Sequence, residues 1–501
     1  MYSFFDAVSL GIPLVFKLDI LILVFIGTVA GLLIGALPGL TSAMAVALLV
    51  PMTYTLSPEQ AFAILLPAYA AGTFGGSVAA ILLNIPGTGA AIMTTLDGSP
   101  LREQGQAGRA IGLAISASVL GGLASAAVLM AIAPAAALWA LKLGAHEYFA
   151  VALFGLVVIA FVSDAPVAGM LSGAVGLLLA TAGNDPAGAY PRFTFGQSEM
   201  VGGLQFVPVM IGLFGIAEVL TVVDRGLADR PPVTQKLKGV YQSLLEPLVR
   251  FTVLVRSIIT GLVIGIMPGS GPTIGSVMSY GLEKSIGRNR AQMGRGAPEG
   301  VIAAEAANNS GTGGALVPMF ALGIPGDAVT AILIGALLIH GLQPGPAMFL
   351  EQPELVSSLF LLFVMGNIFF LAIGLAGLPV LLKILETRPR YLLPVVISLC
   401  LIGSYAASAS LFDAWLALGF GAFGFFMRKL YIPIAPMVLG FILGPLIEDN
   451  LRRAIILDDG DISGFVDHPI SLLAFAGIGL MIVMPQIMKL GRRRAQEVSG
   501  S

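Results

Sequence analysis

The motif Gly-x-x-x-Gly-x-x-Pro-Gly occurs twice in this chain, and each copy interrupts a long apolar run. The first copy spans residues 31–39 and the second spans residues 261–269. Proline removes a backbone donor and glycine relaxes the steric limits on the chain, so we expect a helix to break at each copy. Irregular backbone at membrane depth is tolerated only where it lines a cavity or is buried in protein. The two breaks therefore predict interior positions with exposed backbone groups.

Glycine-rich stretches form a second repeated feature. They begin at Gly72 and Gly311, and each leads to an Ile-Pro-Gly sequence. The separation of Gly72 from Pro86 equals that of Gly311 from Pro325. Two repeats with interrupted hydrophobic segments at corresponding places are typical of secondary transporters. The sequence thus predicts two membrane repeats with broken helices or re-entrant hairpins.

The composition is that of a helical membrane protein. Of the 501 residues, 57% are hydrophobic and 11% are charged, whereas a soluble domain carries about 25% charged residues. Many apolar runs approach the ~20 residues that a helix needs to cross a bilayer. Counting the broken segments as hairpins or half-helices, we expect an all-α polytopic protein with about 12 spans. The apolar segments lie at 18–37, 40–53, 61–83, 110–137, 147–163, 166–182, 203–223, 252–267, 270–282, 300–323, 328–340, 356–384, 391–407, 411–427, 431–447 and 470–489.

These segments fall into two groups around a polar linker. We assign residues 1–225 to a first membrane repeat, 226–250 to a cytoplasmic linker, 251–450 to a second membrane repeat, and 451–501 to a final span with a basic cytoplasmic tail. Later parts of the halves also correspond, because the sequence from Pro208 to Glu218 resembles that from Pro436 to Glu448.

Basic residues in the loops predict that the repeats cross the membrane in opposite senses. Residues 53–60, after the first Pro-Gly break, contain no Lys or Arg, whereas residues 284–295 of the second half contain four. The order reverses after the Ile-Pro-Gly sequences, since Arg102 and Arg109 follow the first and none follows the second between 340 and 354. Basic loops tend to remain in the cytoplasm. We therefore expect an inverted repeat with a cytoplasmic C-terminus; Lys142 and the Arg452-Arg453 pair lie on the unexpected side.

The breaks are candidate binding positions. The N–H groups after a helix break carry a partial positive charge that suits a carboxylate, and nearby hydroxyl and amide groups can bind an anion or a sodium ion. The candidate substrate-binding residues are Pro38, Gly39, Thr41, Gly72, Thr73, Ser77, Asn84, Pro86, Gly87, Thr88, Pro268, Gly269, Ser270, Thr273, Asn308, Asn309, Ser310, Gly311, Thr312, Pro325 and Gly326. The alternative is that these glycines only permit close helix packing.

Asp327 and Glu305 are the candidate cation-coupling residues, because ionisable groups at membrane depth are costly and often functional. Asp327 follows the second Ile-Pro-Gly sequence and corresponds to Thr88, so the halves differ chemically. Asp327 could instead cap the helix that begins at Ala328, and Glu305 could be a paired structural carboxylate. Beyond a coupling Na⁺ or H⁺, we expect no cofactor and no metal site, and the single cysteine, Cys400, excludes a disulfide within one chain.

Sequence motifs of enzymes are nearly absent. There is no Walker A lysine, and the three histidines, His146, His340 and His468, are far apart in the sequence. Ser270 between glycines and the Gly326-Asp327 pair are weak hints of an intramembrane protease, without a visible histidine or second aspartate partner. We expect a protein that is not an enzyme.

The polar stretch at residues 181–196 is long for a turn. The charge pattern places it outside the cell, where it is either a folded external loop or a docking surface for an external partner.

Several stretches resemble the large membrane subunit of the tripartite tricarboxylate transporter family, called TctA. The resemblance covers nearly the whole chain and rests on residues 35–40, 72–77, 83–87, 192–196, 265–269, 308–314 and 322–327. It implies a bacterial inner-membrane carrier, driven by an ion gradient rather than ATP. It also implies a small four-span membrane subunit and a periplasmic solute-binding protein that captures carboxylates such as citrate as partners. We expect import of organic carboxylates with cations; a passive anion channel and an intramembrane enzyme are the alternatives. The composition gives no indication of nucleic-acid binding.

Overall fold

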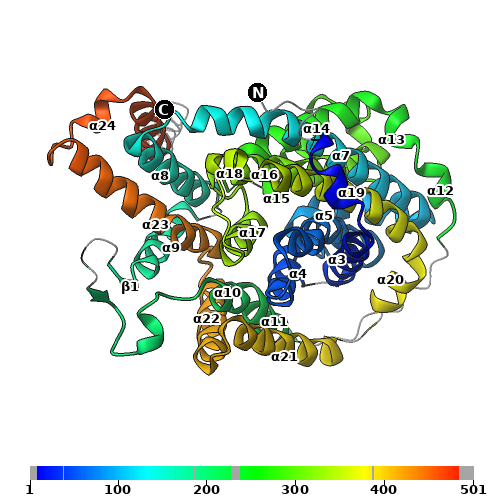
Figure 1. Cartoon of the computed structure of the whole chain (residues 1–501). Helices are drawn as coiled ribbons and strands as arrows, with labels where there is room; N and C mark the ends of the chain where they lie inside the picture. Colours follow the sequence, from blue (N-terminus) through cyan, green and yellow to red (C-terminus); the bar gives the residue numbers. More distant parts are fainter. Residues whose placement is uncertain are drawn as a thin grey trace, which may run out of the picture. The chain divides into compact units, whose positions relative to one another are not determined.

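A computed structural model describes residues 8–37, 39–163, 165–185, 188, 190–226, 237–269, 271–385, 387 and 389–483, and helices dominate it (Figure 1). Among these residues, nine helices are long and apolar enough to cross a membrane, or ten if the bent pair Val240–Val249 and Phe251–Ile266 forms one span. Four shorter apolar helices accompany them, at Ser42–Thr53, Pro166–Ala180, Ala328–Ile339 and Pro469–Val483. The chain is an all-α polytopic membrane protein, and the count of about 12 spans stays a prediction.

The chain forms two compact units, and each unit takes segments from both halves of the sequence. Unit 1 comprises Met1–Leu141 and Gln205–Leu430, and unit 2 comprises Lys142–Leu204 and Tyr431–Ser501. The predicted repeats follow a different division of the chain, and their boundaries stay a prediction.

Unit 1 contains most of the helices. Its elements are α2 (Ile12–Val15), α3 (Leu18–Ala36), α4 (Ser42–Leu49), η1 (Val50–Thr53), α5 (Pro58–Leu83), η2 (Gly89–Ala91), α6 (Ile92–Glu103), α7 (Ala107–Ala140), α10 (Phe206–Met210), the π-helix η4 (Ile211–Ile216), α11 (Ala217–Asp224), α12 (Val240–Ser243), α13 (Glu246–Val249), α14 (Phe251–Ile266), α15 (Gly271–Ile286), η5 (Arg290–Gln292), α16 (Pro298–Leu322), α17 (Ala328–Ile339), α18 (Pro346–Glu351), α19 (Pro353–Ala376), α20 (Leu378–Leu385), α21 (Pro389–Ser408) and α22 (Leu411–Lys429). The predicted segment 356–384 is divided at Gly377, and the polar helix α6 was not predicted.

The helices break at all four predicted places. The first Pro-Gly break separates α3 from α4, and the second separates α14 from α15. The Ile-Pro-Gly sequences separate α5 from η2 and α16 from α17. Helices α5 and α16 end in the same way, because Asn84 and Gly323 follow their last residues with left-handed φ angles of 57° and 70°. These two positions are separated by the same interval as Gly72 and Gly311, so the repeat extends to backbone conformation.

The same close helix crossing occurs in both halves. Helix α3 packs on α5, and a Cβ built on Gly35 would lie 2.2 Å from the Gly72 carbonyl oxygen. Helix α14 packs on α16, and a Cβ built on Gly265 would lie 2.6 Å from the Gly311 carbonyl oxygen. Small residues let helix backbones approach closely within a membrane. The glycines of both motifs therefore have a packing role.

Helices α5 and α16 form the centre of unit 1. Nearly every residue of each helix is buried, and both pack against α7. Helices α21 and α22, from the second half of the sequence, lie beside α10, η4 and α11, from the first half (Figure 1). The halves are thus interlocked within this unit.

Unit 2 also combines helices from both halves of the sequence. Helices α8 (Ala145–Val162) and α9 (Pro166–Ala180), from the first half, pack against α23 (Ile434–Leu457), from the second. The unit also contains the antiparallel strands β1 (Gly183–Asn184) and β2 (Pro191–Arg192), η3 (Ser198–Met200), α24 (Gly464–Asp467) and the apolar helix Pro469–Val483. The predicted span 470–489 coincides with this last helix as far as residue 483, and residues 484–501 lie outside the described part.

Candidate functional site

In each half of unit 1, the Ile-Pro-Gly break lies close to the Pro-Gly motif of the same half. The Gly269 N–H donates to the Gly326 carbonyl at 2.8 Å, which joins the two breaks of the second half. A Cβ built on Gly87 would lie 2.9 Å from the Gly35 carbonyl oxygen, at the corresponding place in the first half. A Cβ built on Gly89 would lie 3.3 Å from the Thr273 hydroxyl, which connects the halves. Residues predicted from separate motifs thus lie in one region.

Asp327 caps α17 and contacts the other repeat. Its carboxylate accepts from the Thr330 N–H at 2.7 Å, and the Thr330 hydroxyl accepts in return from the Asp327 N–H at 2.8 Å. The Tyr69 hydroxyl, from the centre of α5, donates to the other carboxylate oxygen at 2.7 Å. The helix-capping role that the sequence left open is therefore present, and a role in cation coupling stays a prediction.

The repeat-equivalent pair lacks such a bond. Asn308 occupies the position in α16 that Tyr69 occupies in α5, and Thr88 corresponds to Asp327. Both are buried, with 0% of Asn308 and 7% of Thr88 exposed. Among the described residues, neither the Asn308 amide nor the Thr88 hydroxyl has a hydrogen-bond partner, and the same holds for Oδ1 of Asn309. Buried polar groups are nearly always satisfied, so unpaired ones call for an explanation.

Glu305 is the centre of a second polar cluster. Its carboxylate accepts from Ser77 at 2.6 Å, from Ser118 at 2.8 Å and from Thr94. The three hydroxyls come from α5, α7 and α6, whereas Glu305 lies in α16. This arrangement brings Ser77, predicted as a substrate-binding residue, next to a predicted cation-coupling residue.

The remaining candidates are bonded locally or lie elsewhere. Thr73, Ser310 and Thr312 donate to helix carbonyls, and the Thr41 hydroxyl accepts from the Met44 N–H to cap α4. Asn84 and Pro86 are exposed, so they do not join the buried cluster. The Gly39 backbone, with φ of 90°, faces Val222 of α11 instead of the second repeat. Pro38 and Ser270 lie outside the described residues.

The sequence analysis did not single out three residues of the two polar clusters, namely Tyr69, Thr94 and Ser118. Tyr69 could have been found, because it lies three residues before Gly72 as Asn308 lies three residues before Gly311. Thr94 and Ser118 carry no such signal, since single hydroxyl residues in apolar helices usually bond their own backbone. Only the packing of α6 and α7 on α16 brings them to Glu305.

Asp97 fixes the basic loop of the second half onto α6. Its Oδ1 accepts from the backbone N–H groups of Gly294, Gly296 and Ala297 at 2.7–2.9 Å, and Oδ2 accepts from the Tyr280 hydroxyl at 2.8 Å. Four donors on one buried carboxylate offset the cost of its burial. A residue of the first half of the sequence thus holds a loop of the second half.

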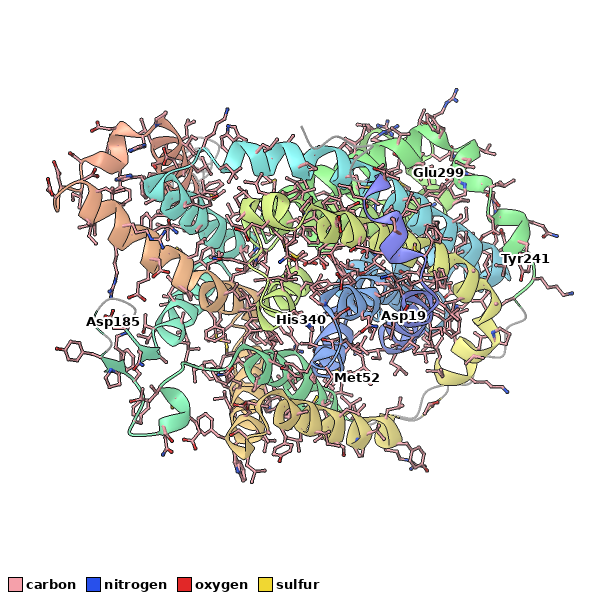
Figure 2. The ribbon with its side chains drawn as sticks, viewed as in Figure 1. Asp19, Met52, Asp185, Tyr241, Glu299 and His340 are labelled. Carbon is pink, nitrogen blue, oxygen red and sulfur yellow. The ribbon has the colours of Figure 1, made fainter. Side chains whose placement is uncertain are left out.

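Two networks of charged side chains hold loops in place. In unit 1, Glu246 accepts from Arg109 and Arg250, and Arg250 also donates to Glu299 at 3.0 Å (Glu299 is labelled in Figure 2). In unit 2, Arg192 and Arg452 both pair with Glu448 and Asp185. Arg452, an exception to the charge pattern, is therefore neutralised by acidic partners.

Unit 2 also brings two of the three histidines together. The rings of His146 and His468 stack with centroids 4.4 Å apart, and each ring contacts a carboxylate, Asp458 or Glu147. His340 belongs to unit 1, where its Nε2 is 3.3 Å from the Thr53 hydroxyl (His340 is labelled in Figure 2). In the described part of the chain, no three His, Cys, Asp or Glu residues are placed to hold a metal ion.

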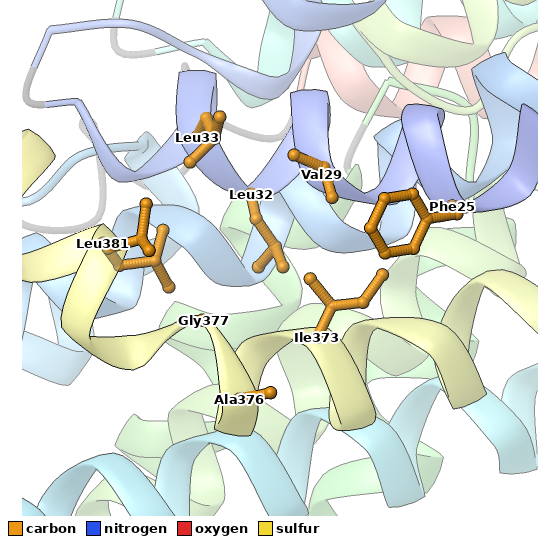
Figure 3. A pocket seen from close by; sticks show the side chains of 9 residues that line it. Phe25, Val29, Leu32, Leu33, Ile373, Ala376, Gly377 and Leu381 are labelled. Atoms are coloured by element: carbon orange, nitrogen blue, oxygen red, sulfur yellow. The ribbon is translucent and has the colours of Figure 1, made fainter.

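An apolar cavity of about 330 Å³ lies between α3, α19 and α20 (Figure 3). Its lining includes Phe25, Leu32, Ile373 and Leu381 and presents no charged side chain. Such a lining suits a hydrocarbon chain and offers nothing to a carboxylate. The lining of the cavity therefore differs from the polar clusters around Asp327 and Glu305.

Comparison with known proteins identifies relatives. The family model described as "Tripartite tricarboxylate transporter TctA family" matches residues 21–439. A protein of Agrobacterium vitis, described as an uncharacterized 52.8 kDa protein in the TAR-I ttuC' 3'region, is 34% identical over 480 residues, which is 95% of this chain and 94% of that protein. A second Agrobacterium vitis protein, in the TAR-II ttuC' 3'region, is 34% identical over 238 residues, which is 48% of this chain and 98% of that protein. No solved structure matches the chain.

Proposed function

The chain belongs to the tripartite tricarboxylate transporter TctA family, and on this premise we propose that it imports an organic carboxylate together with cations. It is a membrane subunit of a transporter, and this family is not a family of enzymes. We place it in the bacterial inner membrane with a cytoplasmic C-terminus. A periplasmic solute-binding protein would deliver the substrate, and a small four-span subunit would complete the complex. An ion gradient, of Na⁺ or H⁺, would drive the import.

The observation that carries the substrate site is the unpaired, buried pair Thr88 and Asn308. A hydroxyl and an amide N–H can both donate to a carboxylate, and leaving them unpaired costs about 1–3 kcal/mol each. A bound substrate would remove that cost. Each of the two residues could therefore bind a group that is absent from the protein chain itself, and Oδ1 of Asn309 could accept from a substrate hydroxyl.

The helix end at Thr88 provides a partial positive charge that suits a substrate anion, whereas the helix end at Asp327 does not. Asp327 caps α17, so its carboxylate already offsets the positive end of that helix dipole. The equivalent residue Thr88 adopts an extended conformation before η2 but makes no side-chain cap bond. The N–H groups after Thr88 thus face no acidic cap, and they suit a substrate anion. On this basis, the substrate carboxylate binds on the Thr88 side and not on the Asp327 side.

Uptake into proteoliposomes tests the proposed function. The full-length chain, its small membrane subunit and the cognate binding protein would be supplied with radiolabelled citrate, and then with a panel of dicarboxylates and aromatic acids. We expect accumulation above equilibrium that requires the binding protein and is lost with an uncoupler or on removal of sodium. A passive channel would equilibrate the solute without concentrating it. Failure of every solute would contradict the transport proposal.

The inverted repeat predicts opposite accessibility of two corresponding loops. Thr55→Cys and Ser285→Cys, both at exposed positions, would be made in a chain whose buried Cys400 is replaced by alanine. An impermeant thiol reagent added to intact cells is expected to label Thr55→Cys alone, because the basic loop 284–295 stays in the cytoplasm. After permeabilisation both should be labelled. Labelling of both, or of neither, in intact cells would contradict the inversion.

A further inference from the structure

Glu305 is the eighth residue of α16, and its carboxylate accepts from hydroxyl groups of three other helices. Ser77 donates to Oε1 at 2.6 Å, Ser118 donates to Oε2 at 2.8 Å, and Thr94 also donates to Oε1. All four residues are fully buried. The two carboxylate oxygens and three hydroxyl oxygens therefore form a compact group of five oxygen atoms.

The charge of this cluster has no counterpart within the described chain. None of the described Lys, Arg or His side chains forms an ion pair with Glu305, whereas Glu246, Glu283 and Glu448 each pair with an arginine. Hydrogen bonds offset part of the cost of burying a carboxylate, as four donors do for Asp97, whereas Glu305 receives from the described residues only three neutral hydroxyl donors and no backbone N–H group. Three hydroxyl groups exceed what a single proton on a carboxyl group needs. Hard cations prefer oxygen ligands of this kind.

We propose that Glu305, Ser77, Thr94 and Ser118 form a binding site for one sodium ion. This inference rests on the proposed function, since it identifies where the coupling ion binds. It reassigns Ser77 from the substrate to the cation and adds Thr94 and Ser118 as ligands. A serine or threonine hydroxyl can turn its hydrogen to a carbonyl of its own helix and direct a lone pair to the ion. Thr73 and Ser116 already donate to their own helices in this way.

The equivalent positions of the other half do not form a second such site, although the helices repeat. The repeat-equivalent of Glu305 is Leu66, and that of Ser77 is Leu316. Both leucines are 0% exposed, so the equivalent positions are apolar. Glu305 belongs to the second half, whereas its hydroxyl partners on α5, α6 and α7 belong to the first. Sodium bound here would hold the two halves together, as a coupling ion must if it is to control their relative movement.

Thermal unfolding of the full-length chain in detergent tests this site without substrate or partners. NaCl would replace KCl at constant total salt, and unfolding would be followed by tryptophan fluorescence. The melting temperature of the wild type is expected to rise with sodium and to reach a plateau. Glu305→Gln, which keeps the shape and removes the charge, should abolish this rise. Thr94→Val and Ser118→Ala should each raise the half-saturating sodium concentration roughly tenfold, corresponding to about 1.4 kcal/mol.

Ser116→Ala is the matched control, because Ser116 is buried on α7 but donates to the Gly112 carbonyl at 2.8 Å. It should keep the sodium response of the wild type. If Glu305→Gln does not fold, Thr94→Val and Ser118→Ala decide the question. An unchanged sodium response in these variants, or a wild type that responds to pH and not to sodium, would overturn the proposal. If the chain accumulates substrate but sodium does not raise its melting temperature, only the sodium site is contradicted. If sodium raises the melting temperature but no substrate is taken up, only the proposed function is contradicted.

Discussion

Asn308→Leu is expected to abolish substrate uptake while leaving the protein as stable as the wild type, or more stable. The Asn308 amide is 0% exposed and has no hydrogen-bond partner among the described residues. An apolar side chain of similar size removes the cost of an unsatisfied buried amide, about 1–3 kcal/mol. It also removes a donor that the substrate carboxylate needs. We therefore expect the uptake rate to fall at least tenfold, which corresponds to a free-energy change of about 1.4 kcal/mol or more. The melting temperature should stay constant or rise.

Thr88→Val should act in the same direction, because valine has the shape of threonine without the hydroxyl. Thr28→Val is the matched control, since Thr28 is buried in α3 and its hydroxyl donates to the Val24 carbonyl at 2.7 Å. Uptake and thermal unfolding would be measured on all three variants at equal expression. Normal uptake by both Asn308→Leu and Thr88→Val would remove the substrate site from this place. A large drop in melting temperature would instead assign Asn308 a structural role.

Gly35→Val is expected to prevent the chain from folding in the membrane. A Cβ at this position would lie 2.2 Å from the Gly72 carbonyl oxygen and 2.9 Å from the Gly72 carbonyl carbon. These are backbone atoms of α5, which no rotamer change can move, so α3 must shift away from α5. Overpacking of this severity costs about 3 kcal/mol or more. Gly265→Val, at the equivalent crossing of α14 and α16, is expected to have the same effect.

Gly419→Val, on the exposed surface of α22, is the control for the helix itself, because a Cβ there would meet nothing within 4 Å. Its cost is expected to stay below about 1 kcal/mol. The amount of monodisperse protein extracted from membranes, and its melting temperature, distinguish the variants. Equal yields of folded protein from Gly35→Val and Gly419→Val would show that the α3–α5 crossing is not as tight as the structure has it.

The helix breaks were predictable because their cause is local. Proline at residues 86 and 325 and glycine beside it disfavour helix in any surroundings, and the breaks occur there. The crossings at Gly35 and Gly265 are alike, which agrees with the equal spacing of the glycine-rich stretches, and the inverted repeat itself stays a prediction. By contrast, helix α6 was not predicted, because Thr94, Asp97 and Arg102 interrupt its apolar residues and the segment lacks the pattern of a membrane span.

The polar clusters were predictable only in part. The position of Asp327 after a break made a helix cap one of the two roles open to it. Its bond to Tyr69 joins residues 258 positions apart, which the sequence did not indicate. The repeat by itself could not show that Tyr69 and Asp327 are bonded to each other while their equivalents, Asn308 and Thr88, have no hydrogen-bond partner among the described residues. That distinction requires knowing which hydrogen bonds are made.

The sequence by itself determined the class of the protein, the four breaks and the family, because composition, proline–glycine chemistry and motif spacing are properties of short stretches. Only the tertiary structure decided that α8 and α9 pack on α23 while α21 and α22 pack on α10 and α11. Only the tertiary structure brought Ser77, Thr94 and Ser118 to Glu305. The physical reason is that a hydroxyl group in an apolar helix can bond its own backbone or a neighbouring helix. The choice between them depends on which helix surface packs against it.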